Sequence, residues 1–397
     1  MSESGWASVD ARARTAKRTA VAETKRGFKR LRERIRNAFT AARNITAKQQ
    51  RRAVWARGWM HKQFRDREDR RQQAATFHVE RAIESDIARV VSGSGPIIVG
   101  PWLSEVGYEV LYWVPFVRWV RSRYGVAADR LVVVTRGGAA SWYADITKNA
   151  VELFDVMPPA EYAARNAERS SGEGGTIKQR AVSAMDRDIV AAAEERVGAR
   201  GARLLHPLLM YQLFHQFWLG HRAPAFLDSH TRYARVAAPD VPLPPLPPRF
   251  TAVKFYTAVT LPPTPFIRRT VQSMVLALAQ RTPVVMLDTG LTLDDHEDYS
   301  FEVAARVHSL REHLDPRDNL AVQTAVIGRA ESFVGTCGAL AWLAPMLGVN
   351  TTAVFANPEF LHGHLQVARR VYANIGGGRF SPLDISALDQ LGLSLTS

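Results

Sequence analysis

From Pro96 onward, short apolar runs alternate with longer segments of helical periodicity, and this alternation constrains the fold more than any other feature of the sequence. Residues 97–99 and 130–135 are two such runs, separated by a glycine-bearing loop and an apolar-periodic helix. Two strands joined by a helix form a crossover unit, which favours a parallel sheet. We therefore expect an α/β fold whose ligands bind beyond the carboxyl ends of the strands.

The same alternation continues in the second half of the chain, after a strand pattern at residues 250–256. The expected strands that follow are residues 283–288, 320–323, 332–335 and 351–355. The expected helices are residues 266–281, 301–314, 324–330 and 336–347. This order predicts a second, doubly wound parallel sheet.

A proline-rich segment separates the two halves. Residues 239–248 hold six prolines in ten positions, a composition typical of an extended and semi-rigid linker. We therefore predict two Rossmann-like lobes, at residues 93–238 and 250–397, joined by a linker at residues 239–249.

Positive charge is concentrated in the first quarter of the chain. Residues 1–90 contain 23 of the 52 Lys and Arg residues but only 10 of the 38 Asp and Glu residues, and no proline precedes Pro96. Such a shift in composition marks a domain boundary. Because Arg, Ala, Lys, Gln and Glu also favour helix, we predict a basic helical N-terminal arm at residues 1–92.

Large apolar side chains, such as Trp55, Trp59 and Phe64, lie among the basic residues of the arm. A basic amphipathic face of this kind, at residues 11–64, suits an anionic membrane surface, where each basic residue contributes about 1 kcal/mol. The alternatives are packing on the body, assembly into a homo-oligomer, and binding of nucleic-acid phosphates. The absence of a nucleic-acid-binding motif disfavours the last of these.

Several classes of protein do not fit the sequence. Cys337 is the single cysteine, which excludes a disulfide framework and a cysteine-rich zinc site. No run approaches 18 uncharged apolar residues, so we expect no membrane span, no signal peptide and a cytoplasmic location, with the arm peripheral on the inner membrane face. The acidic residues at 186–188 and 294–298 lie in polar segments, so we interpret them as solvated and expect no metal or other cofactor. The absence of a GxGxxG fingerprint and a Walker A loop argues against dinucleotide and P-loop enzymes.

In the first lobe, polar residues follow the ends of the predicted strands. Glu105 and Glu109 follow the first strand, where a carboxylate is placed to act as a general base. The alternative role for both is that of a carboxylate stabilising a helix N-terminus. Arg136, Gly137 and Gly138 follow the second strand and are expected on the acceptor side of a cleft.

In the second lobe, Thr336, Gly338 and Ala339 form a turn between a strand and a helix. The backbone N–H groups and positive helix end at such a turn favour phosphate binding. Three basic residues after the first strand of this lobe are candidates to pair with phosphate oxygens, unless they are ordinary surface charges; they are Lys254, Arg268 and Arg269. Glu331 is a candidate to accept hydrogen bonds from the hydroxyls of a ribose.

Two stretches resemble the GT-B glycosyltransferases, most nearly their heptosyltransferase-like branch, glycosyltransferase family 9. In that family an early Gly-Asp precedes an apolar helix with proline six residues after the acid. Glu109 and Pro115 keep this spacing, with Glu in place of Asp and Tyr108 inserted after Gly107. Residues 334–338 and 343–349 resemble the family's late Asp-Thr-Gly turn, helix and Leu-Gly-Val run, without its Asp and His.

The resemblance implies that a nucleotide-sugar donor binds the second lobe and an acceptor binds the first, with Glu109 at the position of the catalytic base. We therefore expect a glycosyltransferase acting on a lipid-linked or cell-surface polysaccharide acceptor. A GT-B-like nucleotide-sugar epimerase or hydrolase is one alternative. A basic-armed nucleic-acid-binding or assembly protein is another, because fold alone does not decide function.

Overall fold

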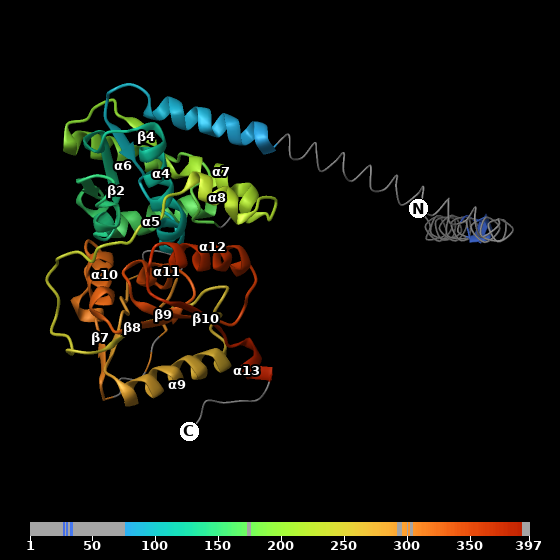
Figure 1. Cartoon of the computed structure of the whole chain (residues 1–397), viewed down its shortest axis with the longest axis vertical. Helices are drawn as coiled ribbons and strands as arrows, with labels where there is room; N and C mark the ends of the chain where they lie inside the picture. Colours follow the sequence, from blue (N-terminus) through green and yellow to red (C-terminus); the bar gives the residue numbers. More distant parts are fainter. Residues whose placement is uncertain are drawn as a thin grey trace, which may run out of the picture. The chain divides into compact units, whose positions relative to one another are not determined.

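The computed structural model describes residues 27, 29, 30, 32–34, 76–172, 176–291, 296–299, 301 and 305–390. The chain divides into two compact units, Met1–Phe77 and His78–Ser397, and the second unit contains both sheets (Figure 1). Most of the predicted arm, including nearly all of residues 11–64, lies outside the described residues. In the part that is described, no helix combines the length and apolar character needed to span a bilayer.

The first sheet contains four parallel strands in the order β3-β2-β1-β4. Its strands are β1 (Ile97–Val99), β2 (Leu131–Thr135), β3 (Asn149–Glu152) and β4 (Arg203–Leu205). Every residue of β1 and β2 is buried, as expected for parallel strands that helices cover on both faces.

Three continuous helical segments follow β1: α3 (Val106–Tyr108), the π-helix η1 (Glu109–Trp113) and α4 (Val114–Tyr124), which ends at Gly125 in the left-handed conformation. The lobe also contains α5 (Pro159–Gly172), α6 (Ala184–Val197), α7 (Pro207–Trp218) and α8 (Pro224–His230). A capping box between Ser183 and Asp186 begins α6.

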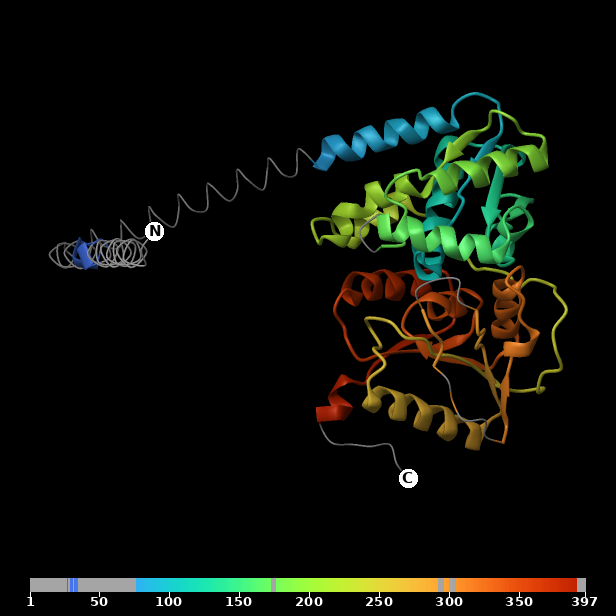
Figure 2. The ribbon, with the colours of Figure 1, turned by 180° about the vertical axis from the view of Figure 1, so that it is seen from behind.

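The second sheet contains six parallel strands in the order β10-β9-β8-β5-β6-β7. They are β5 (Thr251–Lys254), β6 (Val284–Met286), β7 (Val307–Ser309), β8 (Ser332–Thr336), β9 (Asn350–Phe355) and β10 (Phe380–Asp384). The helices are α9 (Pro265–Arg281), α10 (Asn319–Arg329), α11 (Ala339–Met346), α12 (Leu361–Asn374) and α13 (Ser386–Gln390). Figures 1 and 2 show α9 on one face of this sheet and α11 and α12 on the other.

The predicted fold class, α/β with two Rossmann-like lobes, is therefore confirmed for the second unit. Two element predictions were wrong. The predicted strand 320–323 lies inside α10, where nine consecutive residues are buried and the apolar run is the core of a helix. The predicted helix 301–314 contains β7 and the 3-10 turn Arg311–His313 instead, because β7 is an edge strand with little apolar content. Apolar periodicity alone does not separate such cases.

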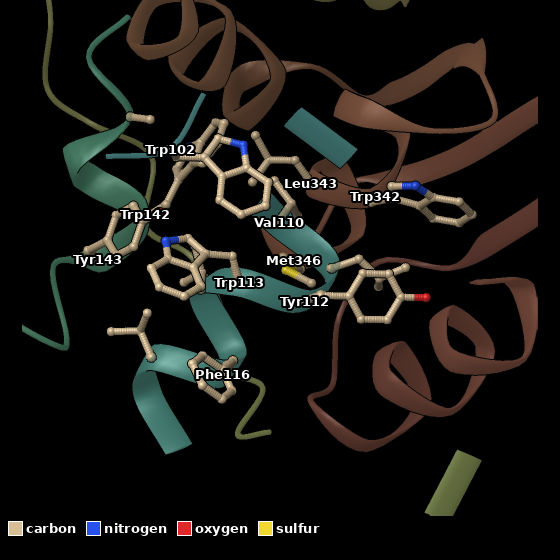
Figure 3. Packing of buried hydrophobic residues seen from close by; sticks show 14 of the residues in the cluster. Trp102, Val110, Tyr112, Trp113, Phe116, Trp142, Tyr143, Trp342, Leu343 and Met346 are labelled. Atoms are coloured by element: carbon tan, nitrogen blue, oxygen red, sulfur yellow. The ribbon is translucent and has the colours of Figure 1, made fainter. Parts of the chain in front are cut away.

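A single apolar cluster contains residues from both sheets and their helices. Figure 3 shows Trp113 and Trp142 of the first lobe packed beside Leu343 and Met346 of α11. Trp142 also donates its indole N–H to the Thr324 hydroxyl on α10 at 3.1 Å. The two lobes of this unit therefore share buried contacts.

Two connecting segments pack on this cluster. Residues 231–249, which contain the predicted linker, have no regular secondary structure, and Val241, Leu243 and Leu246 are partly buried against the cluster. Residues 78–91, assigned to the arm by the sequence, are helical and bury Ile83, Ile87 and Val91 in the same cluster.

Candidate functional site

A cavity of about 350 Å³ is lined by residues from both lobes, a volume in the range of small-molecule sites. Its lining residues follow the carboxyl ends of strands in both sheets, as expected for ligand sites of parallel α/β folds. The first lobe contributes Glu105, Gly107, Tyr108, Tyr112, Arg136 and Lys178. The second lobe contributes Lys254, Tyr256, Asp298, Gly338, Ala339, Phe360 and His364, among others.

The turn between β8 and α11 forms part of this lining through Gly338 and Ala339. Gly338 has a φ of 153°, and a Cβ there would lie 2.5 Å from the Tyr256 hydroxyl oxygen, so only glycine fits. Ala339, the first residue of α11, has a strained φ of 33°. The buried Thr336 hydroxyl donates to the Tyr256 carbonyl and accepts from the Tyr256 N–H, both at 2.9 Å, which ties the end of β8 to the segment that follows β5. The helix N-terminus therefore faces the cavity in a fixed conformation.

Three cationic side chains line the cavity in the described part of the chain. Lys254 forms an ion pair with Asp298 at 2.6 Å and donates to the Leu287 carbonyl at 2.8 Å. Arg136 is 4% exposed, donates to the Tyr162 hydroxyl and lies over that ring. Lys178 donates to the Tyr108 hydroxyl at 3.0 Å.

The two candidate bases occupy different environments. Glu105 is partly exposed and lines the cavity. Glu109 lies in the π-helix, is 1% exposed, accepts a hydrogen bond from the Tyr143 hydroxyl at 2.7 Å and is not part of the cavity lining. Burial raises the pKa of Glu109 to about 7, against the opposing effects of Tyr143 and Arg136. The structure therefore places Glu105, and not Glu109, where a ligand in this cavity can be reached.

Outside the cavity lining lie four of the residues predicted to bind the donor: Arg268, Arg269, Glu331 and the buried Thr336. Arg268 and Arg269 are exposed on α9, and Arg268 lies over the Tyr299 ring. Glu331 forms an ion pair with Arg249 at the opposite end of β8 from the turn. Arg268 thus contacts an aromatic ring and Glu331 contacts an arginine, and neither side chain lines the cavity.

The predicted acceptor-side glycines also lie outside the lining. The N–H groups of Gly137 and Gly138 each donate to the Glu152 carboxylate at 2.9 Å. The Gly137 carbonyl accepts from Leu320 and Ala321 at the start of α10. This turn therefore holds the two lobes together, whereas Arg136 beside it reaches the cavity.

Sequence reasoning missed an aromatic and basic wall of the cavity formed by Tyr108, Tyr112, Lys178 and His364. His364 lies 2.5 Å from the Tyr112 hydroxyl through Nδ1 and 3.5 Å from the Tyr108 hydroxyl through Nε2. Burial lowers the pKa of His364 to about 4, so its imidazole is neutral at pH 7. His364 follows His362 by two positions in the sequence, and among the described residues no group of three or more His, Cys, Asp or Glu is arranged to hold a metal.

Neither a protein-family model nor a curated protein matches the sequence. Solved structures similar to this chain include the E. coli ADP-heptose lipopolysaccharide heptosyltransferase II, with 12% identity, 76% of this chain and 98% of that chain covered, and a TM-score of 0.37. The glycosyltransferase family 9 protein of Veillonella parvula has 10% identity, coverage of 76% and 89%, and a TM-score of 0.39. The UDP-GlcNAc 2-epimerase of Methanocaldococcus jannaschii has 9% identity, coverage of 76% and 92%, and a TM-score of 0.28.

A heptosyltransferase and a family 9 glycosyltransferase are thus among the solved structures that this chain is similar to. Because every one of these TM-scores is below 0.5, the assignment of the fold rests on the two parallel sheets of the chain itself.

Proposed function

We propose that this chain is a glycosyltransferase that moves a sugar from a nucleotide-sugar donor to a lipid-linked or cell-surface polysaccharide acceptor. The observation that carries this proposal is the cavity in which the N-terminus of α11 and the Glu105 carboxylate both lie. An anion-binding helix end on one lobe and a carboxylate on the other are the two groups that this chemistry needs.

In the proposed reaction, the diphosphate of the donor lies at the turn formed by Gly338 and Ala339. Glu105 takes the proton of an acceptor hydroxyl as that oxygen attacks the anomeric carbon. The bond between the anomeric carbon and the diphosphate oxygen breaks, and the nucleoside diphosphate leaves with the electron pair. Backbone N–H groups and the positive end of α11 stabilise the charge that develops on the leaving group.

Lys254 and Arg136 contribute positive potential to the same cavity, although both already have partners. The Asp298 pair holds Lys254 in place, so we propose that Lys254 acts on the phosphates as a positioned charge. The proposed transfer uses no metal ion or other cofactor.

A nucleotide-sugar epimerase or hydrolase is the second candidate. The observation that favours it is the size of the cavity, about 350 Å³, which suits one ligand more readily than a donor and an acceptor together. Analysis of products from a nucleotide sugar incubated without acceptor separates the two. A changed or hydrolysed sugar supports the second candidate, and an unchanged donor supports the transferase.

We also propose that the basic arm associates with an anionic membrane surface and leaves the cavity-bearing unit on the cytoplasmic side. Supporting this proposal are the excess of basic residues in residues 1–90 and the large apolar side chains between them. A homo-oligomer and a nucleic-acid-binding arm remain the competing roles.

The decisive test compares Glu105→Gln with Glu109→Gln in the full chain. A thermal-shift screen of UDP-, GDP-, ADP- and CMP-sugars first identifies the donor. We then expect Glu105→Gln to keep donor binding and to lower turnover by roughly 10²–10⁴-fold, because the base is lost. Glu109→Gln is the matched control and is expected to keep most of the turnover. If Glu109→Gln alone abolishes turnover, Glu109 is the base, and if no nucleotide sugar binds, the proposed function is wrong.

A further inference from the structure

Lys178 lines the cavity and forms no ion pair with any Asp or Glu among the described residues. Buried charges in proteins are normally paired, because an unpaired charge loses its hydration without compensation. Lys254, the other lysine at this cavity, has Asp298 as a partner. Lys178 is partly buried, and among the residues that the structure describes no Asp or Glu forms an ion pair with it.

Neutral groups hold the Lys178 ammonium in place. Nζ donates to the Tyr108 hydroxyl at 3.0 Å and lies 4.6 Å from the centroid of the Tyr108 ring. The Tyr108 ring packs against His364 and Trp218, each with ring centroids 5.3 Å apart. Tyr108 is therefore fixed by its neighbours, and Lys178 with it. An ammonium has three N–H donors, and Tyr108 uses one of them.

The charged groups around Lys178 leave its charge only partly balanced. Burial lowers its pKa, the negative field of Glu105 raises it, and Arg180 lowers it further. His364 and Tyr112 face the same wall, and His364 is neutral at pH 7 because its pKa is lowered to about 4. Glu105 therefore acts on Lys178 without forming an ion pair with it, and the ammonium keeps N–H donors for a ligand.

We propose that Lys178 binds an anionic oxygen group of the ligand, a phosphate or a carboxylate, at the first-lobe wall of the cavity. This inference rests on the proposed function in treating the cavity as the substrate site, and it adds the chemistry of one group of the substrate. The source is either the diphosphate of the donor or an acidic group on the acceptor. The proposed diphosphate site is close to this wall, since a Cβ at Gly107, beside Tyr108, would lie 3.0 Å from the Ala339 backbone nitrogen.

The test uses the full chain and three variants: Lys178→Met, Lys178→Arg and, as a matched control, the exposed Lys148→Met. Isothermal titration measures binding of inorganic pyrophosphate, UDP, GDP, ADP and glucuronate at pH 7. We expect Lys178→Met to weaken binding of at least one of these anions about tenfold or more, because the charge-assisted hydrogen bond from Lys178 is lost. Lys178→Arg retains binding and Lys148→Met leaves it unchanged.

The pattern of loss identifies the source. Weaker binding of pyrophosphate and nucleoside diphosphates assigns Lys178 to the donor, and weaker binding of glucuronate alone assigns it to an acidic acceptor. Equal binding by Lys178→Met and the unaltered chain overturns the proposal, as does the absence of any anion binding by the unaltered chain. Anion binding that depends on Lys178, without binding of any nucleotide sugar, leaves this inference standing and removes the proposed glycosyl transfer.

A second measurement covers the case in which Lys178→Met does not fold. Anion affinity of the unaltered chain is compared with that of Lys178→Arg between pH 7 and pH 10. Because burial lowers the Lys178 pKa, this lysine loses its charge at a lower pH than an exposed lysine does, whereas arginine keeps its charge. A fall in affinity confined to the lysine form supports the proposal, and parallel profiles overturn it.

Discussion

At the scale of single residues, Glu109 is a carboxylic acid buried inside the protein. Its hydroxyl partner Tyr143 is buried as well, so the ionised form has little compensation for lost hydration. The pKa of Glu109 rises from 4.5 to about 7, mainly through burial. Folding therefore costs free energy wherever the unfolded chain has already released this proton and the folded chain has not.

The raised pKa of Glu109 makes the free energy of unfolding depend on pH. The unfolded carboxyl ionises near pH 4.5 and the folded one near pH 7, so the stability contributed by Glu109 is complete below pH 4.5 and is lost as pH rises through 7. We expect Glu109→Gln to raise the free energy of unfolding at pH 8 by on the order of 2 kcal/mol and to change it little at pH 4. Urea unfolding at the two pH values measures this, and an equal effect of the substitution at both contradicts it.

At the scale of elements, the turn between β8 and α11 combines two backbone conformations that side chains rarely adopt. Gly338 has a φ of 153° and Ala339 a φ of 33°, while Thr336 anchors the strand end to Tyr256. Strain of this kind persists only where surrounding contacts enforce it, and it is common at ligand sites. The turn in this conformation places Gly338 and Ala339, at the start of α11, in the cavity lining.

Gly338→Ala is expected to destabilise the chain by about 1–3 kcal/mol and to weaken pyrophosphate binding. The added Cβ would meet the Tyr256 hydroxyl at 2.5 Å and would also require a φ that alanine disfavours. Tyr256→Phe removes the clash but not the backbone strain, so the double variant should recover only part of the stability. Thermal unfolding and titration of the three variants measure this, and a Gly338→Ala chain as stable as the unaltered one would refute it.

At the scale of the whole molecule, the helical residues 78–91 belong to the cavity-bearing unit rather than to a separate arm. Ile87 is fully buried, Glu80 forms an ion pair with Arg222, and Glu84 pairs with His230. Burial of an isoleucine contributes about 1.5–3 kcal/mol, so this helix stabilises the unit by several such contributions. The boundary between the two compact units lies accordingly at Phe77 and not near residue 92.

This boundary leads to a prediction about two shortened chains. A chain that begins at residue 76 is expected to keep its thermal stability and its ligand binding, and to lose flotation with anionic vesicles because the basic segment is gone. A chain that begins at residue 93 should lose stability as well, since the partners of Ile83 and Ile87 are left exposed. Vesicle flotation and urea unfolding measure the two effects. Equal flotation of the full chain and the chain from residue 76 would remove the membrane role.

Most strands and helices were predictable because each one requires a local pattern. Residues 97–99 are all apolar and buried, as in a strand that is covered on both faces. The turn at Gly338 directly follows a strand that the sequence pattern also predicts. Prediction failed where packing decided the outcome. Residues 320–323 read as a strand but are the buried part of α10, and edge strands β3 and β10 carry too little apolar pattern to be seen.

The sequence by itself determined two parallel α/β lobes, because hydrophobic periodicity and turn residues act over a few neighbouring positions. Only the tertiary structure decided that Glu105 lines the cavity while Glu109 is buried four residues further along one helical segment. It also brought Lys178 to Tyr108 across 70 positions and His364 to the same tyrosine across 256. Contacts between residues so far apart depend on how the lobes pack, and no local pattern encodes them.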